Sequence, residues 1–475
     1  MRLVFGLLPF LALQASCAKR SDDAASAHLS EASERLSDEA AGDGSADREA
    51  IEPRLRRLHD GNVRHVILFV ADTLRADRTP PFHRRHVFSP AIERFASASL
   101  AFERAYATSG WTKPSVASLL TGLEVHRHGA RTHQHRLGEE HILLMETLKE
   151  AGFYTAGVIT NGYISEAYGF QRGWDRTLHA KETLRRRGED VAEDVARILR
   201  ERPKDRPLFL YIHTTDPHAP YEPGEEDLAR YDRRRYRGPV HFGGDKLFLE
   251  RIRRGEIWLN ARDRQRLIAL YDAEVSYHDR QFGAIHQVLA KEGIVEDALF
   301  IFTSDHGEEL FDHGSVSHGG RRLYEELVRV PMLVHHPAHR GALRRERVSL
   351  LDVVPTIYHE LGFEPDPQLN GRPLTERIPP SRTMLFETYG IRGILEGDLK
   401  FTIETGIEEG RIALYNLAKD PRERHNLAAS EPDEAARLMA RLQALREGIV
   451  QAANVADSEL DEATLEQLRE LGYIE

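Results

Sequence analysis

Three polar side chains follow apolar runs of the kind that form buried parallel strands. Asp72 comes directly after the run 65–71, and Asp305 with His306 comes shortly after the run 298–302. The carboxyl ends of parallel strands meet at one edge of a sheet, where ligands bind. Carboxylates and imidazoles are common metal ligands. The sequence therefore predicts a metal site at this edge, built from side chains that are far apart in the chain.

Thr112 is predicted to begin a helix. In the segment 110–122, Pro114 suits the first turn, apolar residues recur at helical spacing, and Gly122 suits the end. The unpaired amides and the dipole of a helix N-terminus favour negative charge. A metal ion bound to the Thr112 hydroxyl would lower its pKa and make it a nucleophile at neutral pH. Thr112 thus completes the candidate metal site, and a plain helix cap is the alternative.

The apolar runs alternate with helical patterns over most of the chain. The longest helical pattern covers 263–291, with apolar side chains on one face. This alternation predicts an α/β fold in which a doubly wound, mostly parallel sheet has helices on both faces. We place this catalytic domain at residues 61–381. The predicted strands are 65–71, 155–160, 207–212, 298–302 and 330–334.

The sequence changes character near residue 382. Short alternating segments at 393–403 and 411–417 predict a small antiparallel sheet, and helical patterns follow at about 433–452 and 461–471. Residues 382–475 are therefore expected to form a small α+β subdomain.

Residues 1–17 predict a signal peptide. A short basic start precedes an apolar run that is well below the roughly 20 residues of a membrane-spanning helix. Cys17, the only cysteine, follows small residues and resembles the acylated cysteine of a bacterial lipobox. We expect an exported protein, periplasmic or at the cell surface, bound to a membrane by a lipid anchor at Cys17. Cleavage near Ser16 with an incidental cysteine is the alternative. Residues 18–60 have the composition of an unfolded linker.

The net charge of -11 comes from acidic and basic residues that are interleaved along the chain. A nucleic-acid surface normally needs a concentrated basic face, so nucleic acid is not expected as a partner. Short basic runs at 185–187 and 233–235 have acidic neighbours and are interpreted as solvated faces.

Several short strings occur along the chain in a fixed order. They are ILFVADTLRAD at 67–77, PS at 114–115 with LTG at 120–122, DPHAPY at 216–221, TSDHGEE at 303–309, RVP at 329–331 and LRELGY at 468–473. Together these strings resemble the motifs of the sulfatase family, within the alkaline phosphatase superfamily, and occur in that family's order. The resemblance covers residues from about 63 to the C-terminus and implies an enzyme that attacks a sulfuric- or phosphoric-type ester.

The resemblance implies a role for each matching residue. It makes Asp72, Asp305 and His306 metal ligands and places Thr112 at the position of the family's nucleophile. The remaining matches are His218 and His318, which contact the substrate oxyanion or protonate the leaving group, and Arg127, a basic residue near the active site or a structural salt bridge. Histidine suits proton transfer because its pKa lies near neutrality.

Thr112 also marks a departure from the family. Sulfatases have Cys or Ser at this position, where the side chain is oxidised to formylglycine, and usually Arg where this chain has Val116. Oxidation of a threonine would give a ketone, so that route is closed. A metal-bound threonine is similar to phosphodiester-cleaving and transferring relatives in the superfamily. We therefore expect a phosphomonoester or phosphodiester hydrolase, with sulfuric ester hydrolysis, phosphoethanolamine or phosphoglycerol transfer, or an inactive glycan-binding lipoprotein as alternatives.

The residues at the metal positions bear on which ion is bound. Ala71 occupies a position where calcium-type sulfatases often have a second Asp, and His306 one where many have Asn. One carboxylate fewer and one imidazole more favour zinc or manganese over calcium, which stays an option. Asp216, His218 and His318 would be the residues for a second metal.

The substrate is not identified by any motif. A small molecule, a glycan ester and a lipid ester all remain open. The polar stretch 221–262 is predicted to be an insertion that covers the site and sets specificity, or a solvated excursion.

Overall fold

The computed structural model describes residues 63–83, 87–179, 187–241, 247–318, 322–380, 382–405, 410–447 and the single residues 460, 462, 465 and 468. The predicted signal peptide, the lipid-anchored Cys17 and the linker 18–60 lie outside these residues, as does most of the predicted helix 461–471. No described helix has the length and the apolar composition needed to cross a lipid bilayer.

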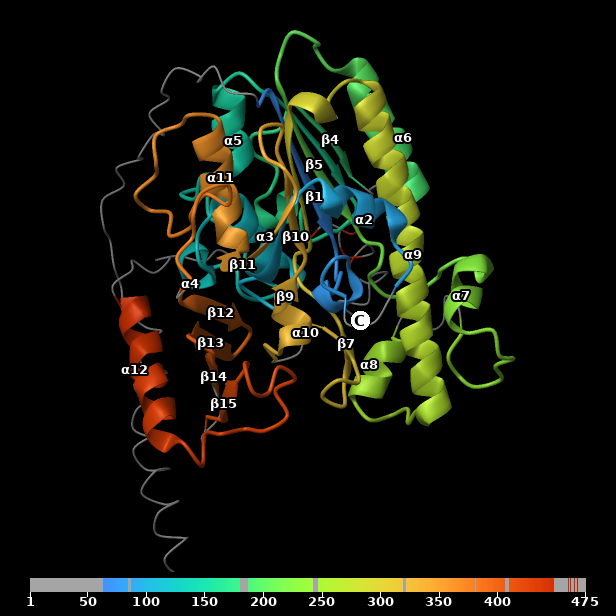
Figure 1. Ribbon diagram of the computed structural model, residues 1–475, viewed down its shortest axis with the longest axis vertical. Coiled ribbons are helices and arrows are strands. Elements are labelled where there is room, and N and C mark those ends of the chain that lie inside the picture. Colours follow the sequence, from blue (N-terminus) through green and yellow to red (C-terminus); the bar gives the residue numbers. More distant parts are fainter. Residues whose placement is uncertain are drawn as a thin grey trace, which may run out of the picture.

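A nine-stranded sheet forms the centre of the catalytic domain (Figure 1). Its strand order is β11-β2-β10-β6-β1-β5-β3-β4, and β9 pairs with β2. The strands are β1 His65–Ala71, β2 Leu100–Tyr106, β3 Tyr154–Ile159, β4 Arg176–His179, β5 Leu208–Thr214, β6 Ala298–Thr303, β9 Arg329–Val330, β10 Met332–His335 and β11 Ala342–Ser349, and a separate hairpin consists of β7 Glu309–Leu310 and β8 Val316–Ser317.

Helices cover both faces of the sheet (Figure 1). Alternate residues of β1 therefore enter two different cores: Val66, Leu68 and Val70 pack with α3, α5 and α11, whereas Ile67 and Phe69 pack with α2, α6 and α9. The α-helices are α2 Pro90–Ser97, α3 Thr112–Thr121, α4 Val125–His128, α5 Leu144–Glu150, α6 Gly188–Glu201, α7 Glu225–Tyr231, α8 Phe248–Arg253, α9 Ala261–Lys291, α10 Glu325–Val328, α11 Val353–Glu360 and α12 Pro432–Glu447. The predicted doubly wound architecture is confirmed.

The segment 330–334 differs from the prediction. It is split into β9 and β10 at Pro331, and β10 runs antiparallel to both β6 and β2. Proline has no amide hydrogen and interrupts a ladder of hydrogen bonds. The sheet is consequently mixed, although the pairs of β1 with β5 and β6, of β3 with β4 and β5, and of β2 with β11 are all parallel.

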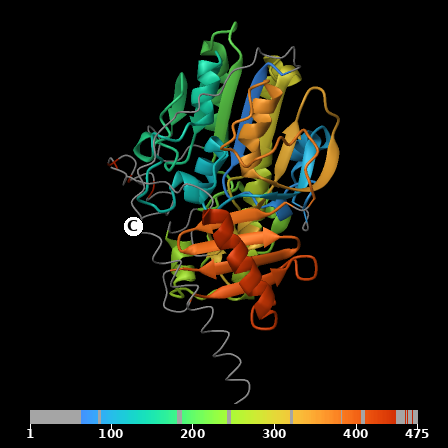
Figure 2. The same cartoon turned by 90° about the vertical axis from the view of Figure 1, so that its left-hand side faces the viewer.

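A four-stranded antiparallel sheet forms the C-terminal subdomain, with α12 packed across it (Figure 2). This confirms the small antiparallel sheet expected after residue 382. Its strands, in spatial order, are β12 Met384–Thr388, β13 Ile391–Glu396, β14 Leu399–Glu404 and β15 Ile412–Asn416.

Lys400 on β14 joins this subdomain to the catalytic domain. Its side chain is fully buried, and its Nζ lies 2.9 Å from Glu423 Oε1 and 3.1 Å from Glu325 Oε1 on α10. Removing one member of a buried ion pair leaves an uncompensated charge and costs about 3–5 kcal/mol. We expect Lys400→Met to lower the free energy of unfolding by about this amount, measured by urea denaturation. The double variant with Glu423→Gln should recover part of the loss, and an additive loss would contradict this account.

His278 on α9 is predicted to make the fold acid-sensitive. Its ring packs on Phe69 and Phe302, neither ring nitrogen has a hydrogen-bond partner among the described residues, and burial lowers its pKa to about 3. The unfolded chain binds this proton below about pH 6.5, so stability is complete above that pH and falls as the pH drops towards 3.

The effect amounts to about 3 kcal/mol between pH 7 and pH 4.5. We expect His278→Leu to lose about that much less stability than the wild type over this interval, measured by urea midpoints at both pH values. His425→Leu is the control because the His425 side chain is 81% exposed. Equal acid losses in wild type and His278→Leu would exclude His278 as the cause.

Candidate active site

Four adjacent parallel strands end at the same edge of the sheet and deliver polar side chains there. Asp72 follows β1, Asp305 follows β6, His213 is the second-last residue of β5, and Asn161 follows β3. All four side chains are at most 1% exposed. Asp72 and Asp305 therefore lie together, as expected for residues that follow parallel strands ending at one edge. The structure adds His213 and Asn161 to the group.

Asp72, His213 and Asp305 form a group that can hold a metal ion. One ligand atom from each lies within 4.8 Å of the others. Asp72 Oδ1, Asp305 Oδ2 and His213 Nε2 are buried and have no hydrogen-bond partner among the residues that the structure describes. Such atoms are costly unless a ligand compensates them. The donor set of two carboxylates and an imidazole therefore fits a divalent cation.

The electrostatic environment of Asp72 and Asp305 also favours a bound cation. Burial opposes the charge on Asp72, but the imidazoles of His218, His213 and His306 together outweigh it, so the pKa of Asp72 is lowered. Burial and the nearby charge of Asp72 raise the pKa of Asp305. Two ionised carboxylates at this spacing repel each other, and a cation between them would remove the repulsion.

His306 turns one nitrogen towards this group. Its Nδ1 lies 2.8 Å from the Gly307 carbonyl oxygen, an acceptor, so Nδ1 holds the proton and Nε2 has the lone pair. Nε2 lies 3.6 Å from Asp72 Oδ1, 3.5 Å from Asp305 Oδ2 and 3.2 Å from Thr112 Oγ1. His306 thus connects the carboxylates with the hydroxyl of Thr112.

Thr112 is the first residue of α3 and is fully buried. The helix ends as expected at Gly122, which has a φ of 72°. No side chain caps its N-terminus, because the preceding residue is Trp111, so the helix dipole and first-turn amides lie beside the Thr112 hydroxyl. Ser115 in the first turn donates a 2.5 Å hydrogen bond to the Asp305 carbonyl oxygen and fixes α3 against the metal-binding edge.

The turn after Asp72 is strained. Thr73 has a φ of 59°, which a β-branched residue rarely adopts. Its amide donates to Asp305 Oδ1 at 3.3 Å, and its carbonyl oxygen accepts a 2.8 Å hydrogen bond from the Tyr271 hydroxyl. These contacts from β6 and α9 hold the turn and thereby fix the direction of the Asp72 carboxylate.

His218 and His318 lie next to the metal-binding group. The ring of His318 is 4.5 Å from that of His306 and 4.8 Å from that of His218, measured between centroids. Burial lowers the pKa of His218 to about 4 and lowers that of His318. Glu308 Oε1 lies 3.0 Å from His318 Nδ1, and burial raises the pKa of Glu308 to about 7.

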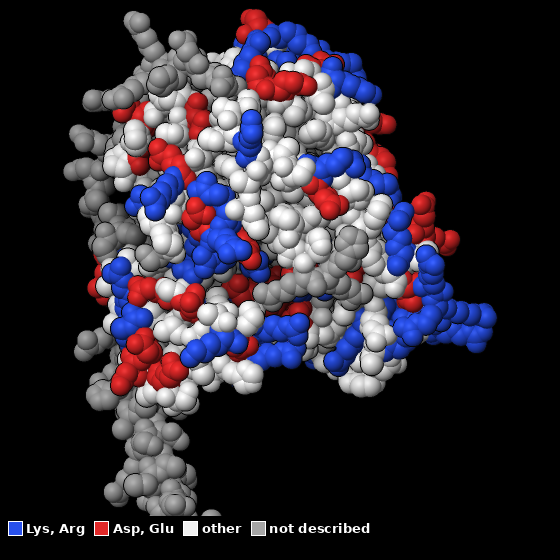
Figure 3. All heavy atoms as spheres, in the orientation of Figure 1, with Lys and Arg blue, Asp and Glu red and all other residues white. Residues whose placement is uncertain are grey.

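The insertion 221–262 reaches the site through α8. This helix packs on the β7–β8 hairpin, and Arg253 donates a 2.6 Å hydrogen bond to the His318 carbonyl oxygen. Figure 3 shows Lys and Arg gathered over α7 and the segment after it, where Arg233, Arg234, Arg235 and Arg237 are exposed.

Arg127 is not joined to the active-site cluster by a described contact. Its guanidinium lies 3.5 Å from Glu124 Oε2 and donates to the Gln368 carbonyl oxygen. These contacts fit the structural salt bridge, which is one of the two roles predicted for Arg127. Asp216, His218 and His318 do not form one of the two groups of possible metal ligands found among the described residues, so the second metal site stays a prediction.

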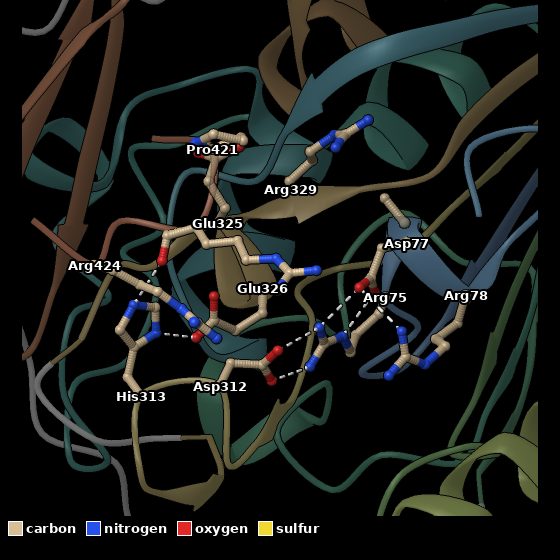
Figure 4. Close-up of a pocket in the computed structure, with 12 residues that line it drawn as sticks. Arg75, Asp77, Arg78, Asp312, His313, Glu325, Glu326, Arg329, Pro421 and Arg424 are labelled. Atoms are coloured by element: carbon tan, nitrogen blue, oxygen red, sulfur yellow. Dashed lines mark hydrogen bonds and ion pairs between the residues drawn. The ribbon is translucent and has the colours of Figure 1, made fainter. Parts of the chain in front are cut away.

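A second group of possible ligands consists of Glu309, His313 and Glu326. His313 Nδ1 lies 2.5 Å from Glu326 Oε1, and its Nε2 lies 3.0 Å from the Arg422 carbonyl oxygen. Burial opposes the charge of His313, but the hydrogen bond to Glu326 raises its pKa. Both nitrogens therefore act as donors, which leaves no lone pair for a metal ion. A cavity of about 290 Å³ lies beside this group (Figure 4). Charged side chains that line the cavity, such as Arg75 and Asp312, form ion pairs with each other.

Sequence reasoning missed His213, Asn161 and Glu308. Asn161 Nδ2 donates a 2.6 Å hydrogen bond to Asp72 Oδ2 and orients that carboxylate. A signal existed for two of them: Asn161 directly follows a predicted strand, and His213 is the one histidine in an otherwise mostly apolar strand. Glu308 has no comparable signal, because it is distinguished from Glu309 by its contacts in the folded chain, above all the one with His318.

Comparison with known proteins shows the family of this chain. The family model described as Sulfatase matches residues 64–363 of this chain. The chain belongs to the sulfatase family. It is an ester-hydrolysing enzyme of that family, whose members depend on a metal ion, and its own acidic and histidine side chains provide a group that can bind one.

The proteins that this chain resembles in sequence or in fold have names that refer to different ester chemistries. The chain is 24% identical to the multifunctional alkaline phosphatase superfamily protein PehA of Trinickia caryophylli, over 77% of this chain and 91% of that one. It is 22% identical to an arylsulfatase of Clostridium perfringens, over 77% and 90%. The fold is similar to that of the phosphonate monoester hydrolase of Agrobacterium radiobacter, with a TM-score of 0.68, 20% identity and coverage of 81% and 96%.

Proposed function

We propose that the enzyme hydrolyses a phosphoric ester, with a phosphodiester favoured, through attack by the Thr112 hydroxyl. The position of Thr112 is the observation that supports this proposal. Its Oγ1 lies 3.2 Å from His306 Nε2, beside two buried carboxylates and at an uncapped helix N-terminus. A hydroxyl with a purely structural role has no need of this surrounding.

Asp72, Asp305, His306 and His213 would hold the metal ion. A divalent ion there supplies positive charge against the ester oxygens and lowers the pKa of the Thr112 hydroxyl. The imidazoles at 213 and 306 favour zinc or manganese over calcium. The amides of the first turn of α3 bind the ester oxygens that face the helix.

In the proposed reaction the Thr112 hydroxyl loses its proton to solvent, and Oγ attacks the phosphorus in line with the leaving oxygen. The bond from phosphorus to the leaving group breaks, and the phosphoryl group stays on Thr112 as a covalent ester. His218 and His318 stabilise the developing charge, and one of them protonates the leaving oxygen. Water then releases the adduct; an acceptor alcohol in place of water would make the enzyme a transferase.

The chemistry of threonine supports phosphate over sulfate. Family sulfatases use an oxidised Cys or Ser, and this chain has neither at position 112. The phosphonate monoester hydrolase and PehA also show that this fold and family include enzymes named for chemistry beyond sulfate esters.

The test is a comparison of three ester classes. The full chain would be loaded in turn with zinc, manganese and calcium and assayed with bis(4-nitrophenyl) phosphate, 4-nitrophenyl phosphate and 4-nitrophenyl sulfate. We expect the highest kcat/KM with the diester and with zinc or manganese. Dominant sulfate turnover would replace this proposal by sulfuric ester hydrolysis, and turnover that rises with added alcohol would favour transfer.

A further inference from the structure

We infer that Glu308 is a positioning residue that orients His318 as the base for the water that releases the threonine ester. This inference rests on the proposed function, because it concerns the second half of that reaction. It identifies which histidine acts on water and adds a residue that the family motifs do not distinguish from its neighbour Glu309.

The contact between Glu308 and His318 fixes the direction of the imidazole. Glu308 Oε1 lies 3.0 Å from His318 Nδ1, a distance that requires a proton between them. When Nδ1–H donates to the carboxylate, the lone pair is on Nε2, on the opposite side of the ring. That side faces away from Glu308, and the ring lies against His306, which contacts Thr112.

Glu308 is itself held from two directions. The Tyr221 hydroxyl donates to its Oε2 at 3.2 Å, and its backbone carbonyl oxygen accepts a 2.9 Å hydrogen bond from Arg75 Nη1. Figure 4 shows the Arg75 guanidinium clamped between Asp77 and Asp312. Glu308 is 0% exposed. A carboxylate held this firmly has little freedom to leave His318.

His218 differs in the group that its Nδ1 faces. This nitrogen lies 2.5 Å from the carbonyl oxygen of Ala219, a neutral acceptor in the adjacent residue. A hydrogen bond to a carboxylate is about twice as strong as one to a neutral group when the imidazole gains a proton. The arrangement of a carboxylate behind a histidine is the one that makes histidine an effective base towards a hydroxyl or water.

Water releases the threonine ester in a single displacement at phosphorus. His318 Nε2 takes one proton from water as the water oxygen bonds to phosphorus. The bond from phosphorus to Thr112 Oγ breaks, and its electron pair returns to Oγ. The Nδ1 proton of His318 remains on the hydrogen bond to Glu308, and the proton gained by Nε2 passes to Thr112 Oγ and restores the hydroxyl.

The experiment separates formation of the adduct from its release. With an aryl diester, the first step liberates 4-nitrophenol and the second frees the enzyme, so stopped-flow kinetics shows a burst followed by a steady state. We expect Glu308→Leu to keep the burst while the steady-state rate falls by about 10²-fold. The phosphorylated chain should accumulate in intact-mass spectra. Glu308→Gln, whose amide oxygen can still accept from Nδ1–H, should recover part of the rate.

Glu309→Gln is the matched control. Glu309 is the adjacent buried carboxylate, but it bonds to Arg322 instead of His318, so its variant should keep both phases. Tyr221→Phe is a milder variant that removes only one contact to Glu308, and it replaces Glu308→Leu if that variant does not fold. We expect Tyr221→Phe to slow the steady-state rate but not the burst.

A fall of burst and steady state by the same factor would overturn the inference, because it would show a structural effect on the whole site. Thr112→Ala distinguishes this from failure of the proposed function. If that variant still turns over the diester, the threonine mechanism itself is wrong. If it is inactive while Glu308→Leu loses both phases equally, only the role of Glu308 is wrong.

Discussion

Replacement of Thr112 by alanine is expected to lower kcat/KM by about 10⁴-fold or more for the preferred ester. The methyl group that remains offers no atom for attack, while the carboxylates, His306 and the helix N-terminus stay in place. Substrate should therefore still bind. The measurement is kcat/KM together with competitive inhibition by inorganic phosphate, whose affinity should change much less than the rate.

Two further variants show whether the hydroxyl itself is responsible. Thr112→Ser keeps the oxygen and should stay within about 10²-fold of the wild type. Thr121→Ala makes the same change at the opposite end of α3, where the hydroxyl donates to the Ala117 carbonyl oxygen, and should leave the rate unchanged. Activity of Thr112→Ala within tenfold of the wild type would exclude Thr112 as the nucleophile.

The active site was predictable where a local rule linked sequence to position. Asp72 and Asp305 follow apolar runs, and all strands that end at one edge bring their next residues together. The same rule applied to the run 155–160 would have given Asn161. His213 was missed because it lies inside its strand, in a position that usually holds a buried apolar residue.

Pairing between distant side chains was not predictable. Nothing in the order of the residues indicates that Glu308 faces His318 whereas Glu309 faces Arg322. The two are neighbours whose side chains point in opposite directions, and the β7–β8 hairpin determines which one meets the site. The role of Arg127 likewise depended on its partners, Glu124 and Gln368.

The fold was predictable for buried strands and long helices but not for polar or short strands. β1, β5 and β6 are apolar throughout and were found, and α9 lies within two residues of its predicted start. β11 has the sequence ALRRERVS and an exposed first half, so its apolar pattern is weak. β9 and β10 both run antiparallel to β2, and this direction depends on the path of the chain between β6 and β9, which periodicity does not encode.

Loss of the Asp305 carboxylate is expected to remove the metal ion as well as the activity. Asp305→Asn keeps the shape of the side chain but replaces an unpaired anionic oxygen with a neutral group at the point where Asp72 and His306 converge. Without that charge the cation is held by one carboxylate. We expect the bound metal, measured by inductively coupled plasma mass spectrometry after dialysis, to fall from about one ion per chain to background.

Thermal stability provides a readout that does not depend on turnover. An ion that binds only the folded chain stabilises it by about 2.7 kcal/mol at a free concentration 100 times its Kd. Added zinc or manganese should therefore raise the Tm of the chelator-treated wild type but not that of Asp305→Asn. His213→Ala should weaken this response, since one ligand is lost while both carboxylates remain.

The acidic group around His313 serves as the control for this metal prediction. Glu326→Gln alters a cluster in which both imidazole nitrogens already face acceptors, so metal content and the Tm response should be unchanged. A metal loss in Glu326→Gln with none in Asp305→Asn would place the ion at the wrong end of the β7–β8 hairpin for attack by Thr112. In that case the uncapped helix N-terminus alone would have to activate the hydroxyl, and its contribution of about 0.3–1 kcal/mol is too small to do so.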